Sequence, residues 1–181
     1  MDRSLQGATA ALLIGTSILV LLISNAVAQE QKVPALPTPE MQRLSKLYLG
    51  TWSYTEKYPN GGVNTGVYTS ELGPGGNSIV NRFHSKGPMG EFDGLMVMTW
   101  DSNEKAYKAY VFSGASATAL VETGQWEGDV LVYRAELSAG ARKFALRNAT
   151  KFLDGKITSD QFSSANGSPE SLLVHVEAFK N

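Results

Sequence analysis

Residues 119–137 read ALVETGQWEGDVLVYRAEL, and the pattern of this segment indicates the fold class. Its second half, Val130–Leu137, alternates well: positions 131, 133, 135 and 137 are apolar and share one face, and the charged residues at positions 134 and 136 lie on the other. The segment Glu127-Gly128-Asp129 between the two halves supplies residues that tolerate the positive φ of a tight turn. Two strands of this kind, joined by a short turn, are typical of an antiparallel sheet with one face buried and one face in water.

The same period of two continues on both sides of this hairpin. We expect ten strands, separated by turn residues such as Asn60-Gly61-Gly62 and Asp154-Gly155. They are Trp52–Tyr58, Val67–Leu72, Ser78–His84, Phe92–Trp100, Ala106–Phe112, Ala119–Trp126, Val130–Leu137, Arg142–Phe152, Lys156–Ser163 and Leu172–Phe179. Short turns throughout favour an all-β, antiparallel up-and-down meander closed into a barrel. A two-layer β-sandwich is the alternative, and a parallel α/β fold is not expected because no helix-length pattern separates the strands.

One short helix precedes the strands. Thr38 suits the N-cap, Pro39 the first helical position, and apolar residues at 41, 44, 47 and 48 recur at helical spacing. Gly50 can end the helix in a left-handed conformation. We therefore expect one domain over residues 38–181, after a linker at 29–37 that contains two prolines.

The first 28 residues have the pattern of a signal peptide. An uncharged apolar run over 8–23 is followed by Ala26-Val27-Ala28, the small-x-small pattern that signal peptidase recognises. The run is slightly short for a membrane span, which needs about 20 apolar residues. We expect cleavage after Ala28, an extracytoplasmic mature protein (periplasmic or secreted) and no stable membrane span.

Composition excludes several classes of function. The net charge of −1 offers no basic field for nucleic acid, and the chain has no cysteine for disulfides, thiolate catalysis or cysteine-ligated metals. No local spacing of histidines and carboxylates predicts a metal site, so neither a metal nor a cofactor is expected.

A short helix followed by Gly50-Thr51-Trp52 resembles the opening of lipocalin-like (calycin) barrels. That resemblance implies a structural role for Gly50 and Trp52, with the indole closing one barrel end under a late basic residue, for which Arg147 and Lys180 both qualify. The segments 87–94, 99–101, 105–107 and 124–129 make residues 41–180 similar to the bacterial domain-of-unknown-function family 1579. That family implies a small barrel-like domain and no established activity.

Ionisable residues give no catalytic constellation. The carboxylates considered for a catalytic pair are Glu91, Asp93, Glu122, Glu136 and Asp160, whose separation the sequence does not define. His84 and His175 are expected to be ordinary strand residues. A resemblance to nitrobindin-type barrels leaves open a second role for His175, as an axial haem ligand.

The segment Phe92–Trp100 is apolar on both faces, which indicates a strand that is buried on both sides or lines a cavity. Methionine and aromatic side chains suit an adaptable apolar pocket. The residues expected to line such a pocket are Met96, Met98, Trp100, Tyr110, Phe112 and Trp126. The leading hypothesis is a binding module for a small apolar or amphipathic ligand. The alternatives are a hydrolase or isomerase with a carboxylate or histidine in the barrel mouth, and a structural or protein-interaction domain.

Overall fold

A computed structural model describes residues 36–88, 90–114 and 116–181. The expected signal peptide and most of the expected linker lie outside the described residues. The elements, in chain order, are α1 (Pro39–Tyr48), β1 (Gly50–Lys57), β2 (Val63–Leu72), the 3₁₀ turn η1 (Pro74–Gly76), β3 (Ser78–Gly87), β4 (Gly90–Asp101), β5 (Ala106–Ser113), β6 (Leu120–Glu127), β7 (Val130–Ala139), β8 (Arg142–Leu153), β9 (Lys156–Ala165) and β10 (Ser171–Lys180).

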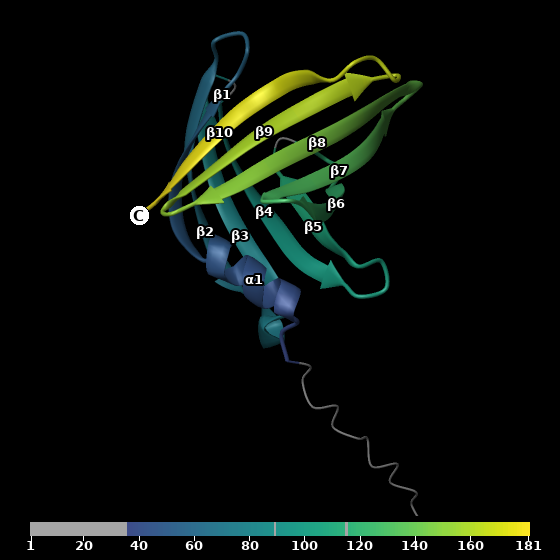
Figure 1. The fold of residues 1–181 in the computed structure, drawn as a ribbon. Helices are drawn as coiled ribbons and strands as arrows, with labels where there is room; N and C mark the ends of the chain where they lie inside the picture. The colour runs from purple at the N-terminus through teal and green to yellow at the C-terminus, as the bar shows by residue number, and fades with distance from the viewer. Residues whose placement is uncertain (1–35, 89, 115) are drawn as a thin grey trace, which may run out of the picture. The chain divides into compact units, whose positions relative to one another are not determined.

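The strands form one closed antiparallel barrel (Figure 1). Each strand pairs with its neighbours in the chain, and β10 returns to β1 with Trp52 opposite Lys180. Closure satisfies the backbone groups of both terminal strands, so the sheet has no free edge. The predicted up-and-down barrel after one short helix is thus confirmed, and the sandwich alternative is excluded.

The strand boundaries in the structure differ most from those expected from the sequence at the start of β2. The strand begins at Val63 rather than at Val67, and β3 continues three residues beyond His84 to Gly87. The additional residues pair with one another, with Thr65 opposite Lys86. Their polar and glycine-containing sequence resembles a loop, and cross-strand hydrogen bonding overrides that local preference.

Helix α1 lies across one end of the barrel (Figure 1). Thr38 caps it as expected, accepting a hydrogen bond from the backbone N–H of Met41 at 3.2 Å. Met41, Leu44 and Tyr48 are buried in the core, and the Tyr107 hydroxyl donates to the Glu40 carbonyl at 3.2 Å. Apolar packing and this hydrogen bond together fix the helix on the barrel end. None of the helices in the described ranges is long and apolar enough to cross a membrane.

Trp52 joins the helix to the barrel. The side chain is 3% exposed, and its indole N–H donates to the Tyr48 carbonyl at 2.9 Å, satisfying one carbonyl of the last helical turn. Lys180 lies over the ring, with its Nζ 5.6 Å from the centroid, whereas Arg147 pairs with Glu170. Lys180 is therefore the late basic residue that covers the tryptophan.

Gly50 meets a backbone requirement at the same junction. The helix ends at Tyr48, and Gly50 opens β1 with φ +119°, a conformation that residues with a Cβ rarely adopt. A Cβ at this position would also lie 3.0 Å from Cε of Lys180. The glycine thus lets the chain turn from the helix into the barrel beside the lysine that covers Trp52.

Three interior glycines each accommodate an aromatic ring from the neighbouring strand. A Cβ built at Gly124 would lie 2.5 Å from Cε1 of Tyr133, its cross-strand partner. Glycine leaves room for another group to approach the backbone closely, so each ring lies against the barrel wall. The pairs in register are Gly66 with Tyr54, Gly94 with Phe83, and Gly124 with Tyr133.

Candidate ligand-binding cavity

The barrel interior contains a cavity of about 300 Å³. Tyr48 of α1 lines it, together with side chains from strands around the barrel. Its wall is mainly apolar and aromatic, as is usual for sites that bind small molecules. The apolar and aromatic lining residues are Tyr48, Tyr54, Tyr68, Phe83, Met96, Val111, Leu120, Leu146, Ile157, Phe162, Leu173, Val176 and Ala178.

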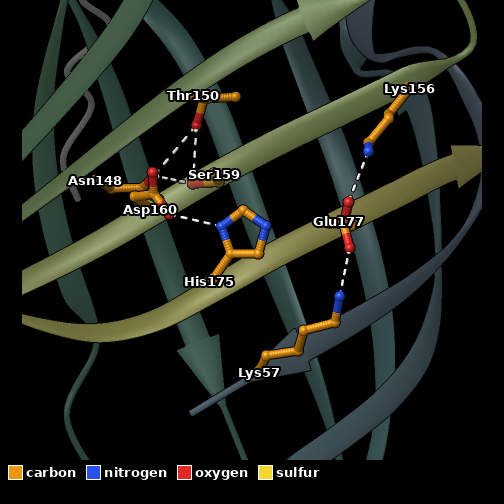
Figure 2. Close-up of polar contacts among 8 residues, drawn as sticks. All are labelled: Lys57, Asn148, Thr150, Lys156, Ser159, Asp160, His175 and Glu177. Atoms are coloured by element: carbon orange, nitrogen blue, oxygen red, sulfur yellow. Dashed lines mark hydrogen bonds and ion pairs between the residues drawn. The ribbon is translucent and has the colours of Figure 1, made fainter. Parts of the chain in front are cut away.

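A smaller set of polar side chains interrupts this wall. On β8 and β9, Asn148, Thr150 and Ser159 form a hydrogen-bonded cluster (Figure 2). The Thr150 hydroxyl lies 3.2 Å from both Oδ1 of Asn148 and Oγ of Ser159, and the Ser159 hydroxyl donates to the same Asn148 oxygen. The polar lining residues are Glu56, Asn81, Glu122, Arg147, Asn148, Thr150, Ser159 and Gln161.

Glu56 is one of two glutamates on the cavity wall, and its carboxylate already has donors. Oε2 accepts hydrogen bonds from the Tyr58 hydroxyl and the Asn64 amide, each at 2.9 Å. Burial and the nearby Glu56 charge raise the pKa of Tyr58 to about 12. The carboxylate of Glu56 therefore has hydrogen-bond partners within the protein.

Glu122 on β6 is the other glutamate, and its setting is different. The residue is 7% exposed, and no hydrogen bond or ion pair joins its carboxylate to another residue in the described ranges. Burial raises its pKa from 4.5 to about 7, because removal from water penalises the charged form. Its charge in turn contributes to raising the pKa values of Tyr48 and Tyr133, both of which burial raises most. The hydroxyl of Tyr133 is itself buried without a hydrogen-bond partner within the described structure.

The six residues expected to line a pocket lie in four different places. Met96 lines the cavity, and Met98 beside it is 0% exposed in the core. Tyr110 and Phe112 alternate with the inward residues of β5 and are 38% and 48% exposed, so they lie on the outer face.

Trp100 and Trp126 line a separate surface hollow beside α1. The Trp126 ring lies under the guanidinium of Arg43, whose Cζ is 3.7 Å from the ring centroid, and its N–H donates to the Tyr107 hydroxyl at 3.3 Å. Trp100 packs edge-on against Tyr107, with ring centroids 4.9 Å apart. The two tryptophans therefore hold the helix end of the barrel together.

Both histidines pair with an aspartate of the adjacent strand. Nδ1 of His175 lies 2.6 Å from Oδ1 of Asp160 (Figure 2), and Nδ1 of His84 lies 3.0 Å from Oδ1 of Asp93. His175 alternates with the inward-facing Val174 and Val176, so it points away from the cavity. No group of three or more metal-ligating side chains forms among the described residues. The position of His175 thus gives no support for an axial ligand inside the barrel.

Of the five carboxylates considered from the sequence, Glu122 is the one that lines the cavity. The sequence could have indicated this position, because Glu122 is four residues from Trp126 on the same strand, and residues an even number apart on a strand share a face. The sequence did not indicate Glu56 or the cluster at 148, 150 and 159 as lining residues. Alternation along each strand predicts which residues share a face with them, but it does not predict that a cavity lies on that side.

No family model matches this chain, and no curated protein matches it significantly in sequence. Rv2717c from M. tuberculosis is similar in structure, with a TM-score of 0.56 and 16% identity over 80% of this chain and 99% of that one. Two further structures are more distant: the S-type phycobiliprotein lyase CPES from Guillardia theta (TM-score 0.49, 9% identity, 77% and 92% coverage) and a de novo designed fluorescence-activating β-barrel (TM-score 0.43, 13% identity, 76% and 96% coverage). The likeness to Rv2717c and the closed barrel of this chain fit the lipocalin-like fold that the sequence predicts.

Proposed function

We propose that the barrel is a binding module for a small amphipathic ligand, held in the interior cavity. The observation that carries the proposal is the cavity itself, about 300 Å³ with aromatic and aliphatic walls and a few polar groups. An apolar tail would bury its surface against Phe83, Met96 and Val111, while a polar end would reach the hydrogen-bonding groups.

The expected affinity follows from the size of the tail. Each buried CH₂ contributes about 0.8 kcal/mol, so an eight-carbon chain contributes about 6 kcal/mol before association costs. A dissociation constant of 1 mM corresponds to about 4 kcal/mol. Association costs at least about 4 kcal/mol, so the tail alone leaves about 2 kcal/mol, and contacts of the polar end must contribute about 2 kcal/mol more to reach 1 mM. Binding of an octyl ligand at about 1 mM is therefore the threshold that tests the tail and the polar end together.

Calorimetric titration with 1-octanol, together with native mass spectrometry of freshly purified protein, tests this proposal. Val111→Trp replaces a small aliphatic side chain on the cavity wall by a bulky indole ring and should weaken binding at least about tenfold, while the thermal unfolding transition is retained. Val121→Trp, at an exposed position of β6, is the matched control. Octanol binding weaker than about 1 mM, or unaffected by Val111→Trp, would contradict the proposal.

A second candidate function is a hydrolase or isomerase with Glu122 as general acid or base. The observation that favours it is the pKa of about 7, which suits proton transfer near neutral pH. Loss of a measured turnover in Glu122→Gln, with ligand affinity unchanged, would support this candidate over simple binding.

Two further proposals rest on the sequence. Export and cleavage after Ala28 follow from the apolar run and the Ala26-Val27-Ala28 site. Kinship with the domain-of-unknown-function family 1579 follows from the similarity of the segments 87–94 and 124–129.

A further inference from the structure

The charged residues on the cavity wall differ in whether they have partners. Glu56 accepts from Tyr58 and Asn64, and Arg147 forms a two-point ion pair with Glu170. Within the described part of the chain, Glu122 is the charged lining residue without a hydrogen bond or ion pair. A buried group left unpaired costs stability, so its presence calls for an explanation from function.

The geometry points to Glu122 as the residue that selects the ligand's polar end, and we propose that this end is a protonated amine. The inference rests on the proposed binding function of the cavity. An ionised carboxylate only accepts hydrogen bonds, while an ammonium group carries three donors and the opposite charge. A charge-assisted hydrogen bond between them would form in a poorly hydrated setting, where such bonds are strong.

The rest of the cavity wall agrees with a cationic end. Tyr48, Tyr54 and Tyr68 face the same cavity, and aromatic rings attract cations through their faces. Arg147, the lining residue with a positive charge, is already neutralised by Glu170 and is thus a weak site for an anionic end. A fatty-acid carboxylate would bring a second negative charge beside Glu122, which is unfavourable.

Folding has already placed Glu122 in its buried position. The carboxylate is removed from water before any ligand arrives, so binding does not incur that cost again. The ligand's own desolvation is then offset by the new hydrogen bond and by contact with the rings. Because Glu122 is buried before the ligand binds, we expect it to change the relative affinities of ligands with different head groups. It should not change the contribution of the apolar tail.

Three ligands with the same tail isolate the head group: octylamine, 1-octanol and octanoate. Titration calorimetry at about pH 8, where Glu122 is mostly ionised, should show octylamine binding about 10- to 100-fold more tightly than octanol, with octanoate weakest. Glu122→Gln should weaken octylamine by about the same factor and leave octanol within about threefold. Octanoate should bind this variant more tightly than it binds the wild type.

The control is Glu136→Gln, which makes the same charge change on the exposed face of β7 and should preserve the amine preference. Near-UV circular dichroism of each variant establishes that the barrel is intact. If octanol binds but octylamine is not preferred, or if the preference survives in Glu122→Gln, the inference is overturned and the binding function stands. If none of the three ligands binds the wild type, both proposals fail.

Discussion

Replacing Glu122 by Gln should make the ligand-free barrel more stable at alkaline pH and leave it nearly unchanged in acid. The substitution keeps the shape of the side chain and removes the group that titrates. Burial raises the pKa of Glu122 from 4.5 to about 7 in the folded protein, whereas the unfolded chain exposes this carboxyl to water.

The sign follows from proton counting. Between pH 4.5 and about 7 the native state holds a proton at Glu122 that the unfolded state has released. Stability falls with pH wherever the native state binds more protons, so the wild type loses stability across this window. At 1.36 kcal/mol per pKa unit, the difference between 4.5 and about 7 corresponds to about 3 kcal/mol once both states are ionised.

Urea unfolding of both proteins at about pH 4.5 and about pH 8.5 measures this difference. The free energies of unfolding should agree within about 0.5 kcal/mol in acid, and the variant should be more stable by up to about 3 kcal/mol in base. Surface ion pairs such as Lys57–Glu177 are the same in both proteins, so their contributions cancel in the comparison. Glu136→Gln, which removes a carboxyl from the exposed face of β7, is the control for the change in net charge. A constant difference between wild type and Glu122→Gln at both pH values would refute the reasoning, since it would mean that the native carboxyl is not electrostatically strained.

The tryptophan junction, the glycine-paired rings and the export signal can each be tested separately. Trp52→Ala should lower the free energy of unfolding by about 3–5 kcal/mol, because it empties a buried site and removes the hydrogen bond to Tyr48; a loss below about 1 kcal/mol in urea would contradict its structural role. Gly124→Ala should cost about 1–3 kcal/mol by forcing the Tyr133 ring off the wall, and an unchanged urea midpoint would count against close packing there. The exported protein should begin at Gln29 by N-terminal mass spectrometry, whereas a membrane-bound product that retains residues 8–23 would rule out cleavage.

The fold was predictable because each strand carries its own signal. Alternation within Val130–Leu137 and the turn residues before it identify a hairpin without knowledge of the rest of the chain. The start of β2 lacks such a signal, since Asn64 and Gly66 both favour turns. These residues are extended because β1 and β3 flank them, and that constraint comes from the barrel as a whole.

The cavity was predictable only in part. The sequence placed Met96 on an inward face, as the structure does. Its partner on β5 is Val111, so Tyr110 and Phe112, on either side of Val111, point to the outer face. Pairing register depends on the turn at 102–105, and a shift of one residue exchanges the two faces of a strand. Tyr110 and Phe112 were expected to line the pocket because they are apolar, yet they lie on the outer surface. Glu122, a charged residue, lines the cavity instead.

The number of strands explains why a cavity exists at all. An eight-stranded barrel is just wide enough for side chains to fill, and barrel diameter grows with the number of strands. This barrel has ten strands, so its own interior side chains are spread over a wider ring. Helix α1 fills one end with Met41, Leu44 and Tyr48, and the glycine-paired rings lie against the wall rather than across the centre. Glu122 lines the remaining volume, and among the residues that the structure describes its carboxylate has no hydrogen bond or ion pair. A stably filled core would exclude such a group, so the combination of cavity and carboxylate favours a ligand site over a purely structural barrel.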